Sequence, residues 1–306
     1  MDTILLSTGT NTLTEWYGIE TAYKMIKKAG FDAVDYTLFN SWGMNSLLSS
    51  ESELKKFHRE SAEMAKDNGI ELFQAHAPMR FGRQDDKQIE NDIYGSALAC
   101  GAAGIPYLVV HPIHTDISYG LKDYDAWKKR NLDMMRCLLP VLRDNNVYVC
   151  VENMYGKTPA AHTVCPTFPS YPEHLADYID SMNELAGEKR FYACLDTGHM
   201  VLSGISAEYA VKALGDRIRV LHIHDNNGKS DEHTLPQIDK DCYGCTGIVD
   251  WRAFTEALCE IGYTGTMNLE SDGMLGLYGK DVAEASLSVM SGVCARLTRM
   301  MAKETD

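Results

Sequence analysis

Acidic and imidazole side chains recur at the ends of apolar, strand-like segments along this chain. His76 closes the segment IELFQAHAP, His111 closes IPYLVVHP and Glu152 closes NVYVCVEN. Later segments continue the pattern, with Asp196 and His199 in FYACLDTGHM, His222 in IRVLHIHD, Glu270 in GTMNLESDG, and Asp231 and His233 in the loop after His222. Packing of an apolar core does not explain why such side chains occur at the same end of several strands. A divalent metal site does, because it needs oxygen and nitrogen ligands from separate backbone segments.

The two glutamates carry more weight than any single histidine. A lone histidine at a strand end is more often a hydrogen-bonded structural residue than a ligand. A buried carboxylate is rare unless it is paired or coordinated, and two that face each other repel unless a cation lies between them. Metal coordination by Glu152 and Glu270 removes that repulsion. His114 and His224 are further candidates, and spacing alone does not decide between His222 and His224.

The elements that would position these residues alternate between strand and helix. Eight β-rich runs are expected at 3–9, 33–39, 70–77, 106–112, 147–153, 191–197, 219–225 and 266–272. Amphipathic segments with apolar residues at three-and-four spacing lie between them, and a last helix covers roughly 281–302. Eight such units without a composition break predict a single (β/α)8 TIM barrel over residues 1–306. An open doubly wound sheet is the alternative, but the first strand lacks a GxGxxG turn.

Composition narrows the class of protein. The net charge of −14 argues against the basic footprint of a nucleic-acid binder. Apolar runs are strand-sized and the N-terminus has no signal-peptide pattern, so we expect no membrane span and a cytoplasmic location. The chain has 9 cysteines, several within expected core elements, which is typical of reduced thiols. Cys242 and Cys245 form a CxxC without a second pair, so we expect reduced loop cysteines there.

The strand-end residues, taken in order, resemble the xylose-isomerase-like TIM-barrel superfamily of sugar-phosphate isomerases, epimerases and type IV AP endonucleases. The resemblance runs along essentially the whole chain and rests on HAP (76–78), VVHP (109–112), VEN (151–153), LDTGH (195–199), LHIHD (221–225), DEH (231–233) and NLES (268–271). It implies a small-molecule carbohydrate substrate. Dimers and tetramers are common in the group, so a homo-oligomer fits the resemblance.

The resemblance also implies a core metal bound by Glu152, Asp196, His222 and Glu270. In the isomerases and epimerases that ion is commonly Mn²⁺, Co²⁺ or Mg²⁺, and it stabilises a cis-enediolate while two glutamates move the proton alpha to the carbonyl. Glu152 and Glu270 would be those two catalytic residues, with His199 as a third that hydrogen-bonds a substrate hydroxyl.

In the endonucleases the core is extended to three Zn²⁺ ions. His76 and His111 with Glu152 would hold a second ion here, and His199, Asp231 and His233 a third, so a multi-zinc phosphodiesterase or another hydrolase or lyase is the alternative function. A non-catalytic sugar-binding protein is a third reading, less favoured because binding alone does not need two flanking glutamates.

Several departures from both groups bear on the choice. The endonucleases follow their strand-three histidine with an aromatic–aliphatic wedge that enters DNA, whereas Ala77-Pro78-Met79-Arg80 stands here. The GxG that often follows the loop histidine is replaced by the insertion TLPQIDKDCY and a GxxG at Gly244 and Gly247. Gly228-Lys229 occupies the region where ketose 3-epimerases carry an arginine. The first departure favours a sugar isomerase or epimerase over an endonuclease. The second makes the loop unusual for either group and weakens the assignment of Asp231 and His233 as ligands. The third argues against a strict ketose 3-epimerase.

Aromatic and basic residues in the loops beyond strands two, three and five are candidate substrate contacts, although ordinary loop roles are more common for each. They are Trp42, Met79, Arg80, Phe81, Tyr155 and Lys157. Trp251, which opens a helix, is expected to be a packing anchor.

Overall fold

A computed structural model of the chain describes residues 4–39, 50–78, 85–113, 123–158, 161 and 163–302. All eight predicted strands form, and they make one parallel sheet in the order β10-β1-β2-β3-β4-β5-β8-β9. Their bounds are β1 (Leu5–Gly9), β2 (Ala33–Thr37), β3 (Glu71–His76), β4 (Tyr107–Val110), β5 (Tyr148–Glu152), β8 (Phe191–Asp196), β9 (Ile218–His222) and β10 (Thr266–Leu269).

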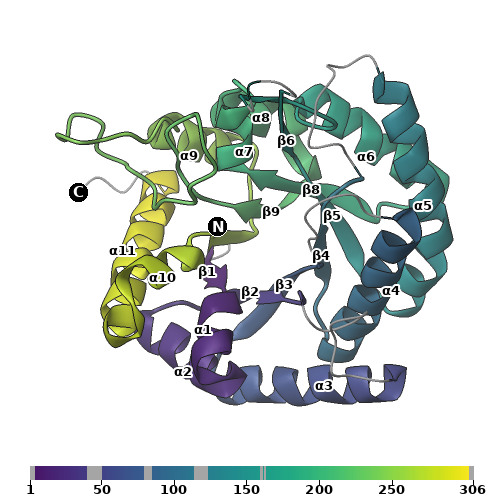
Figure 1. Cartoon of the computed structure of the whole chain (residues 1–306), viewed down its shortest axis with the longest axis horizontal. Helices are drawn as coiled ribbons and strands as arrows, with labels where there is room; N and C mark the ends of the chain where they lie inside the picture. The colour runs from purple at the N-terminus through teal and green to yellow at the C-terminus, as the bar shows by residue number, and fades with distance from the viewer. Residues whose placement is uncertain are drawn as a thin grey trace.

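The sheet closes into a barrel between β9 and β10. The Ile223 N–H donates to the Asn268 carbonyl over 2.9 Å, and the Glu270 N–H donates to the Ile223 carbonyl over 3.0 Å. A ring of helices surrounds the strands, as Figure 1 shows. The predicted single (β/α)8 barrel is therefore confirmed.

The outer helices occupy the segments that carry three-and-four spacing. They are α2 (Ile19–Ala29), α3 (Glu51–Asp67), α4 (Asp86–Ala103), α5 (Tyr124–Asp144), α6 (Pro172–Ala186), α8 (Ala207–Leu214), α9 (Trp251–Glu260) and α11 (Ala283–Met301). Glycines in the left-handed region end three of them, because glycine adopts a positive φ without strain: Gly30, Gly104 and Gly187. Among the described helices, none is long and apolar enough to cross a membrane.

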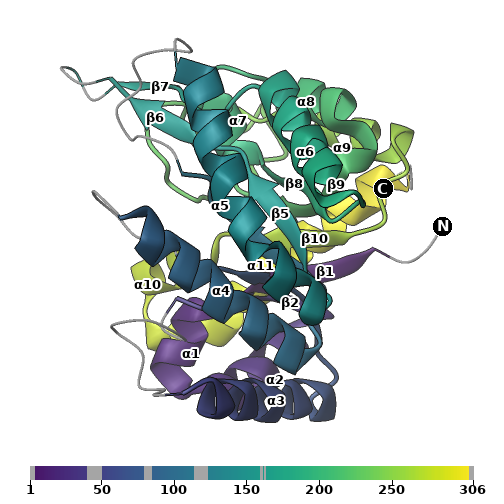
Figure 2. The same cartoon turned by 90° about the vertical axis from the view of Figure 1, so that its right-hand side faces the viewer.

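Short elements decorate the end of the barrel where the strands finish. They are α1 (Asn11–Tyr17), the hairpin β6 (Tyr155–Lys157) and β7 (Val164–Pro166), α7 (Thr197–Leu202) and α10 (Leu275–Tyr278). In Figure 2 the hairpin, α1 and α10 lie at the end of the barrel opposite the N-terminus. Sequence periodicity did not indicate these elements, because each is too short to show a period.

Two apolar layers hold the fold together. The larger lies between strands and helices and includes Trp251, which is 1% exposed and so is the packing anchor that we expected. A separate small cluster joins Val109, Cys150, Cys194 and Val220, one from each of β4, β5, β8 and β9. This second cluster fills the inside of the barrel, as side chains from alternate strand positions do in this fold.

Candidate metal centre

The barrel interior determines where the predicted ligands point. Successive strand residues face opposite sides, so a residue two positions after an interior residue also faces inward. Each member of the small interior cluster is followed two residues later by a predicted ligand: Val109 by His111, Cys150 by Glu152, Cys194 by Asp196 and Val220 by His222. The ligands therefore form the next layer above this cluster, at the carboxyl ends of the strands.

Glu152, His222 and Glu270 meet at the centre of that layer. The Nδ1 atom of His222 lies 3.4 Å from Glu152 Oε2 and 3.3 Å from Glu270 Oε2. All three atoms are buried, and none of them makes a well-aligned hydrogen bond with another described residue. Asp196 joins them, since one ligand atom from each of the four residues lies within 4.8 Å of the others. Three carboxylates and one imidazole that converge in this way fit a divalent cation with oxygen-rich coordination.

His76 and His111 extend this core through Glu152. The Nε2 atoms of His76 and His111 lie 3.5 Å and 3.0 Å from Glu152 Oε2. The His76 ring also stacks on that of His222, with ring centroids 5.4 Å apart. The structure thus brings the second predicted ligand group together around one shared carboxylate.

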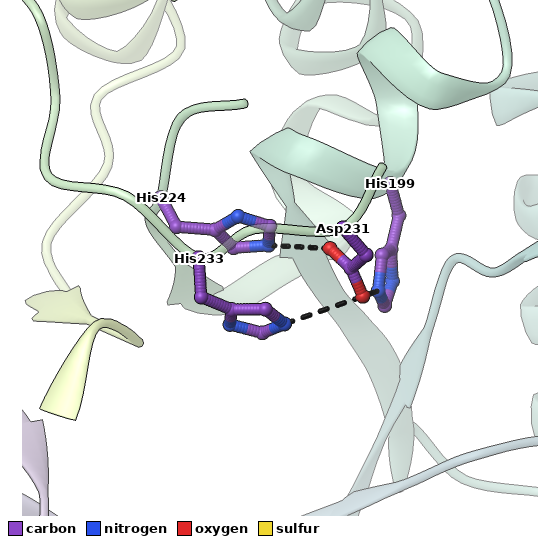
Figure 3. A group of neighbouring side chains, drawn as sticks. All are labelled: His199, His224, Asp231 and His233. Atoms are coloured by element: carbon purple, nitrogen blue, oxygen red, sulfur yellow. Dashed lines mark hydrogen bonds and ion pairs between the residues drawn. The ribbon is translucent and has the colours of Figure 1, made fainter. Parts of the chain in front are cut away.

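The third group gathers around Asp231, as Figure 3 shows. The Nε2 atoms of His199 and His233 lie 3.4 Å and 3.3 Å from Asp231 Oδ2. His224 is a fourth member, with its ring stacked on His233 at a centroid distance of 3.9 Å. Its Nε2 lies 3.1 Å from Asp196 Oδ2, so His224 connects the core to this group.

The histidines are oriented as metal ligands usually are. In His76, His199 and His233 the Nδ1 atom bonds a backbone carbonyl, of Ala77 at 2.7 Å, Asn153 at 2.9 Å and Glu270 at 2.8 Å. A carbonyl only accepts hydrogen bonds, so each Nδ1 carries a proton, and each Nε2, which faces the carboxylates, is free to present its lone pair to a cation placed among them. An outer partner that fixes the tautomer in this way is typical of metal-binding histidines.

Charge balance in the core is maintained by neighbouring imidazoles. Burial alone raises the pKa of Glu152, but the charges of His111 and His222 outweigh burial and hold it well below its usual range. Burial lowers the pKa of His222, yet the nearby acids hold it well above its ordinary value. Burial raises the pKa of Glu270, and the charges of His222 and His233 more than offset this. A bound cation would take the place of these protons, so metal binding should release protons.

Asp225 fixes the loop that carries Asp231 and His233. This aspartate is fully buried and accepts hydrogen bonds from Ile248 N at 2.9 Å, Trp251 Nε1 at 2.9 Å and Gln237 N at 3.2 Å. The insertion TLPQIDKDCY therefore folds back onto the barrel. Asp231 still lies beside both His199 and His233, despite the missing GxG.

A cavity of about 190 Å³ opens beside the core, on the side of β1, β2 and β10. Its lining includes Asp35, His76, Asn268, Glu270 and Asp272. His76, His233 and Glu270 all lie in its wall, so a small molecule in this cavity would contact the candidate ligands directly.

Sequence reasoning found most of this site, but it left one contributor undecided and missed another. His224 was left undecided against His222, and the structure shows that the two serve different clusters. Asp35, inside the second strand (AVDYT), was overlooked, although an acidic residue in a buried strand indicates a paired or functional carboxylate. The segment after Asp196 forms the short helix α7, which Asp196 caps by accepting the His199 N–H over 2.6 Å.

Only some of the candidate substrate contacts in the loops lie within the described residues. The ring of Tyr155 packs against His199, with centroids 5.1 Å apart, and Lys157 is exposed. Trp42, Met79, Arg80, Phe81 and His114 lie outside the described residues. The cysteines are unpaired in the structure, including Cys242 and Cys245.

The fold and this arrangement of candidate ligands define a class of protein, and comparison with known proteins identifies the family. A family model described as "Xylose isomerase-like TIM barrel" matches residues 23–291, and the chain belongs to this family. The uncharacterized protein y4fM of Sinorhizobium fredii is 24% identical over 305 residues, covering 89% of this chain and 87% of its own.

Solved structures share the same fold. A D-tagatose 3-epimerase-like protein superposes with a TM-score of 0.68 at 19% identity, covering 98% of this chain and 99% of its own. The IolI protein with a bound zinc atom superposes with a TM-score of 0.66 at 17% identity, covering 99% of this chain and 100% of its own.

Proposed function

We propose that this protein is a divalent-metal-dependent sugar isomerase or epimerase. The observation that carries the proposal is the pair of buried glutamates on either side of one imidazole. Glu152 and Glu270 come from β5 and from the end of β10, and both direct a buried oxygen at His222 Nδ1. The similarity in fold to a D-tagatose 3-epimerase-like protein supports the same class of reaction.

Glu152, Asp196, His222 and Glu270 would hold the ion. When bound, the ion would supply Lewis-acid stabilisation of negative charge on the substrate's oxygen atoms. For a turnover one glutamate must be ionised and the other protonated, and the ionised carboxylate takes the proton from the carbon next to the substrate carbonyl. The other glutamate, in its protonated form, returns a proton to the reacting carbon. His199, whose Nδ1 is bonded to Asn153, would orient a substrate hydroxyl.

Deuterium wash-in tests this proposal. Candidate ketoses and ketose phosphates are incubated with the Mn²⁺-loaded protein in D₂O, and exchange next to the carbonyl is followed by NMR. Glu152→Gln and Glu270→Gln should each lower exchange by at least about 100-fold, because each removes a proton-transfer group. Glu232→Gln, in an exposed part of the metal-site loop, is the matched control and should exchange normally. Full activity in either core variant would remove that glutamate from the acid–base role.

A multi-zinc hydrolase is a second candidate, and one observation favours it. All three ligand groups assemble here, including the Asp231 cluster that a single-metal isomerase does not need. Three clustered cations suit phosphodiester hydrolysis, because they activate water and neutralise the phosphate. Three Zn²⁺ per chain together with nicking of abasic DNA, and no sugar exchange, would favour this function over the isomerase.

A further inference from the structure

The buried imidazole of His222 has two different sides. Its Nδ1 faces Glu152 and Glu270 and has no well-aligned hydrogen-bond partner in the part of the chain that the structure describes. Its Nε2 lies 2.9 Å from Asp35 Oδ2, across the barrel on β2. For Nδ1 to present a lone pair to a cation, the ring proton must be on Nε2. A carboxylate opposite Nε2 is the partner that stabilises this tautomer.

Asp35 is itself held in place by a chain of polar side chains across the barrel. Gln74 Nε2 donates to Asp35 Oδ2 over 2.8 Å, and Thr266 Oγ1 donates to Gln74 Oε1 over 3.0 Å. All four side chains of the chain Thr266–Gln74–Asp35–His222 are buried, with Asp35 only 5% exposed. The chain joins β10, β3, β2 and β9, so the Asp35 carboxylate has one well-defined orientation.

A register shift in the sheet makes this chain of contacts possible. Between β2 and β3 the pairing changes after Val34, which pairs with Leu72, so that Asp35 stands opposite Gln74. An irregularity that places an acid beside its hydrogen-bond donor is what a side chain with a positioning task requires. The remaining Asp35 oxygen, Oδ1, is buried and has no hydrogen-bond partner among the described residues.

We propose that Asp35 is the positioning residue of the metal core: its carboxylate fixes the His222 tautomer and ring orientation, and so sets the affinity of the core for a divalent cation. Asp35 acts through His222 and does not itself bind the ion. The inference rests on the metal core of the proposed function, but not on its sugar chemistry. An outer carboxylate of this kind is typically worth 10- to 100-fold in metal affinity.

The test uses the full chain and the metal alone. Mn²⁺ affinity is measured by titration calorimetry, and the visible absorption of the Co²⁺-loaded protein reports on the coordination of the ion. Asp35→Asn keeps the size of the side chain but removes its charge, and it should weaken Mn²⁺ binding by about 10- to 100-fold and alter the Co²⁺ spectrum. Asp32→Asn, just before β2 at a half-exposed position, is the matched control and should bind as the wild type does.

A second variant covers the case in which Asp35→Asn does not fold. Gln74→Met removes the donor that orients Asp35 while leaving the carboxylate in place, so it should weaken binding by a smaller factor with the same spectral change. Wild-type affinity and an unaltered Co²⁺ spectrum in a folded Asp35→Asn or Gln74→Met protein would overturn the role of Asp35. Failure of the wild type to bind Mn²⁺ or Co²⁺ would instead overturn the metal core itself. Absence of sugar exchange would affect neither result.

Discussion

Replacing Asp225 by asparagine should release the loop that completes the candidate site. Each oxygen of the buried Asp225 carboxylate accepts at least two hydrogen bonds: Oδ1 accepts from Ile248 N and Val249 N, and Oδ2 from Gln237 N and Trp251 Nε1. An amide presents an NH₂ group on one of these sides, so at least two donors lose their acceptor. At about 1–3 kcal/mol for each stranded donor, the expected loss of unfolding free energy is about 2–6 kcal/mol.

Urea denaturation measures this loss, and limited trypsin digestion at Lys240 reports whether the loop has opened. The exposed residue Asp241 lies in the same loop, so Asp241→Asn is the control and should stay within about 0.5 kcal/mol of the wild type. Opening of the loop should also reduce metal binding by the Asp231 cluster while leaving the core affinity intact. An Asp225→Asn protein with unchanged stability and unchanged digestion would refute the reasoning.

Three further predictions follow from single contacts. Gly198→Ala should destabilise the fold by about 1–3 kcal/mol, because its Cβ would lie 1.9 Å from Cε1 of the buried His224 ring; Gly292→Ala, where the new Cβ meets open space, should not destabilise it. Burial lowers the pKa of His58 from 6.5 to about 4, so protonation favours the unfolded chain. The contribution of neutral His58 to the free energy of unfolding should therefore be fully present above pH 6.5. The free energy of unfolding should fall by about 3 kcal/mol as the pH drops to 4. Addition of Mn²⁺ at about 100 times its Kd should raise the unfolding free energy by about 2.7 kcal/mol, and a chelator should reverse this gain.

Each of these predictions has a clear contrary outcome. Equal thermal stability of the two glycine variants would show that the His224 ring can move without cost. For His58, the comparison is with His58→Gln, which keeps an acceptor for the Tyr36 hydroxyl that lies 2.9 Å from His58 Nδ1. An unchanged pH slope in that variant would assign the acid sensitivity to other groups. A denaturation midpoint that does not respond to any divalent cation would contradict the proposed metal core.

Sequence patterns predicted the barrel and the main ligands because both depend on local periodicity. Eight apolar runs separated by amphipathic segments specify the topology, and a ligand two residues after an interior position must face the same interior. His222 joins the core and His224 joins the Asp231 cluster. Which histidine joins which cluster depends on where β9 ends and how the loop after it folds, and residue spacing predicts neither. Asp35 matters because of a register shift between two strands, which only the three-dimensional pairing reveals.

The loop insertion shows that a motif can also mislead, when a contact elsewhere in the fold replaces it. TLPQIDKDCY appeared to weaken the assignment of Asp231 and His233, because it replaces a GxG found in relatives. The buried Asp225 holds this loop in place by accepting hydrogen bonds from backbone N–H groups within and just after the insertion. A contact between residues 12 and 23 positions apart in the chain is not visible in a motif.

The most direct test of the metal core is a crystal structure of the protein grown with Mn²⁺ and Zn²⁺, with the ions located by anomalous scattering at the absorption edge of each metal. The account predicts an anomalous peak coordinated by Glu152, Asp196, His222 and Glu270. A metal-loaded crystal with no peak among these four residues, or with peaks only elsewhere, would contradict it.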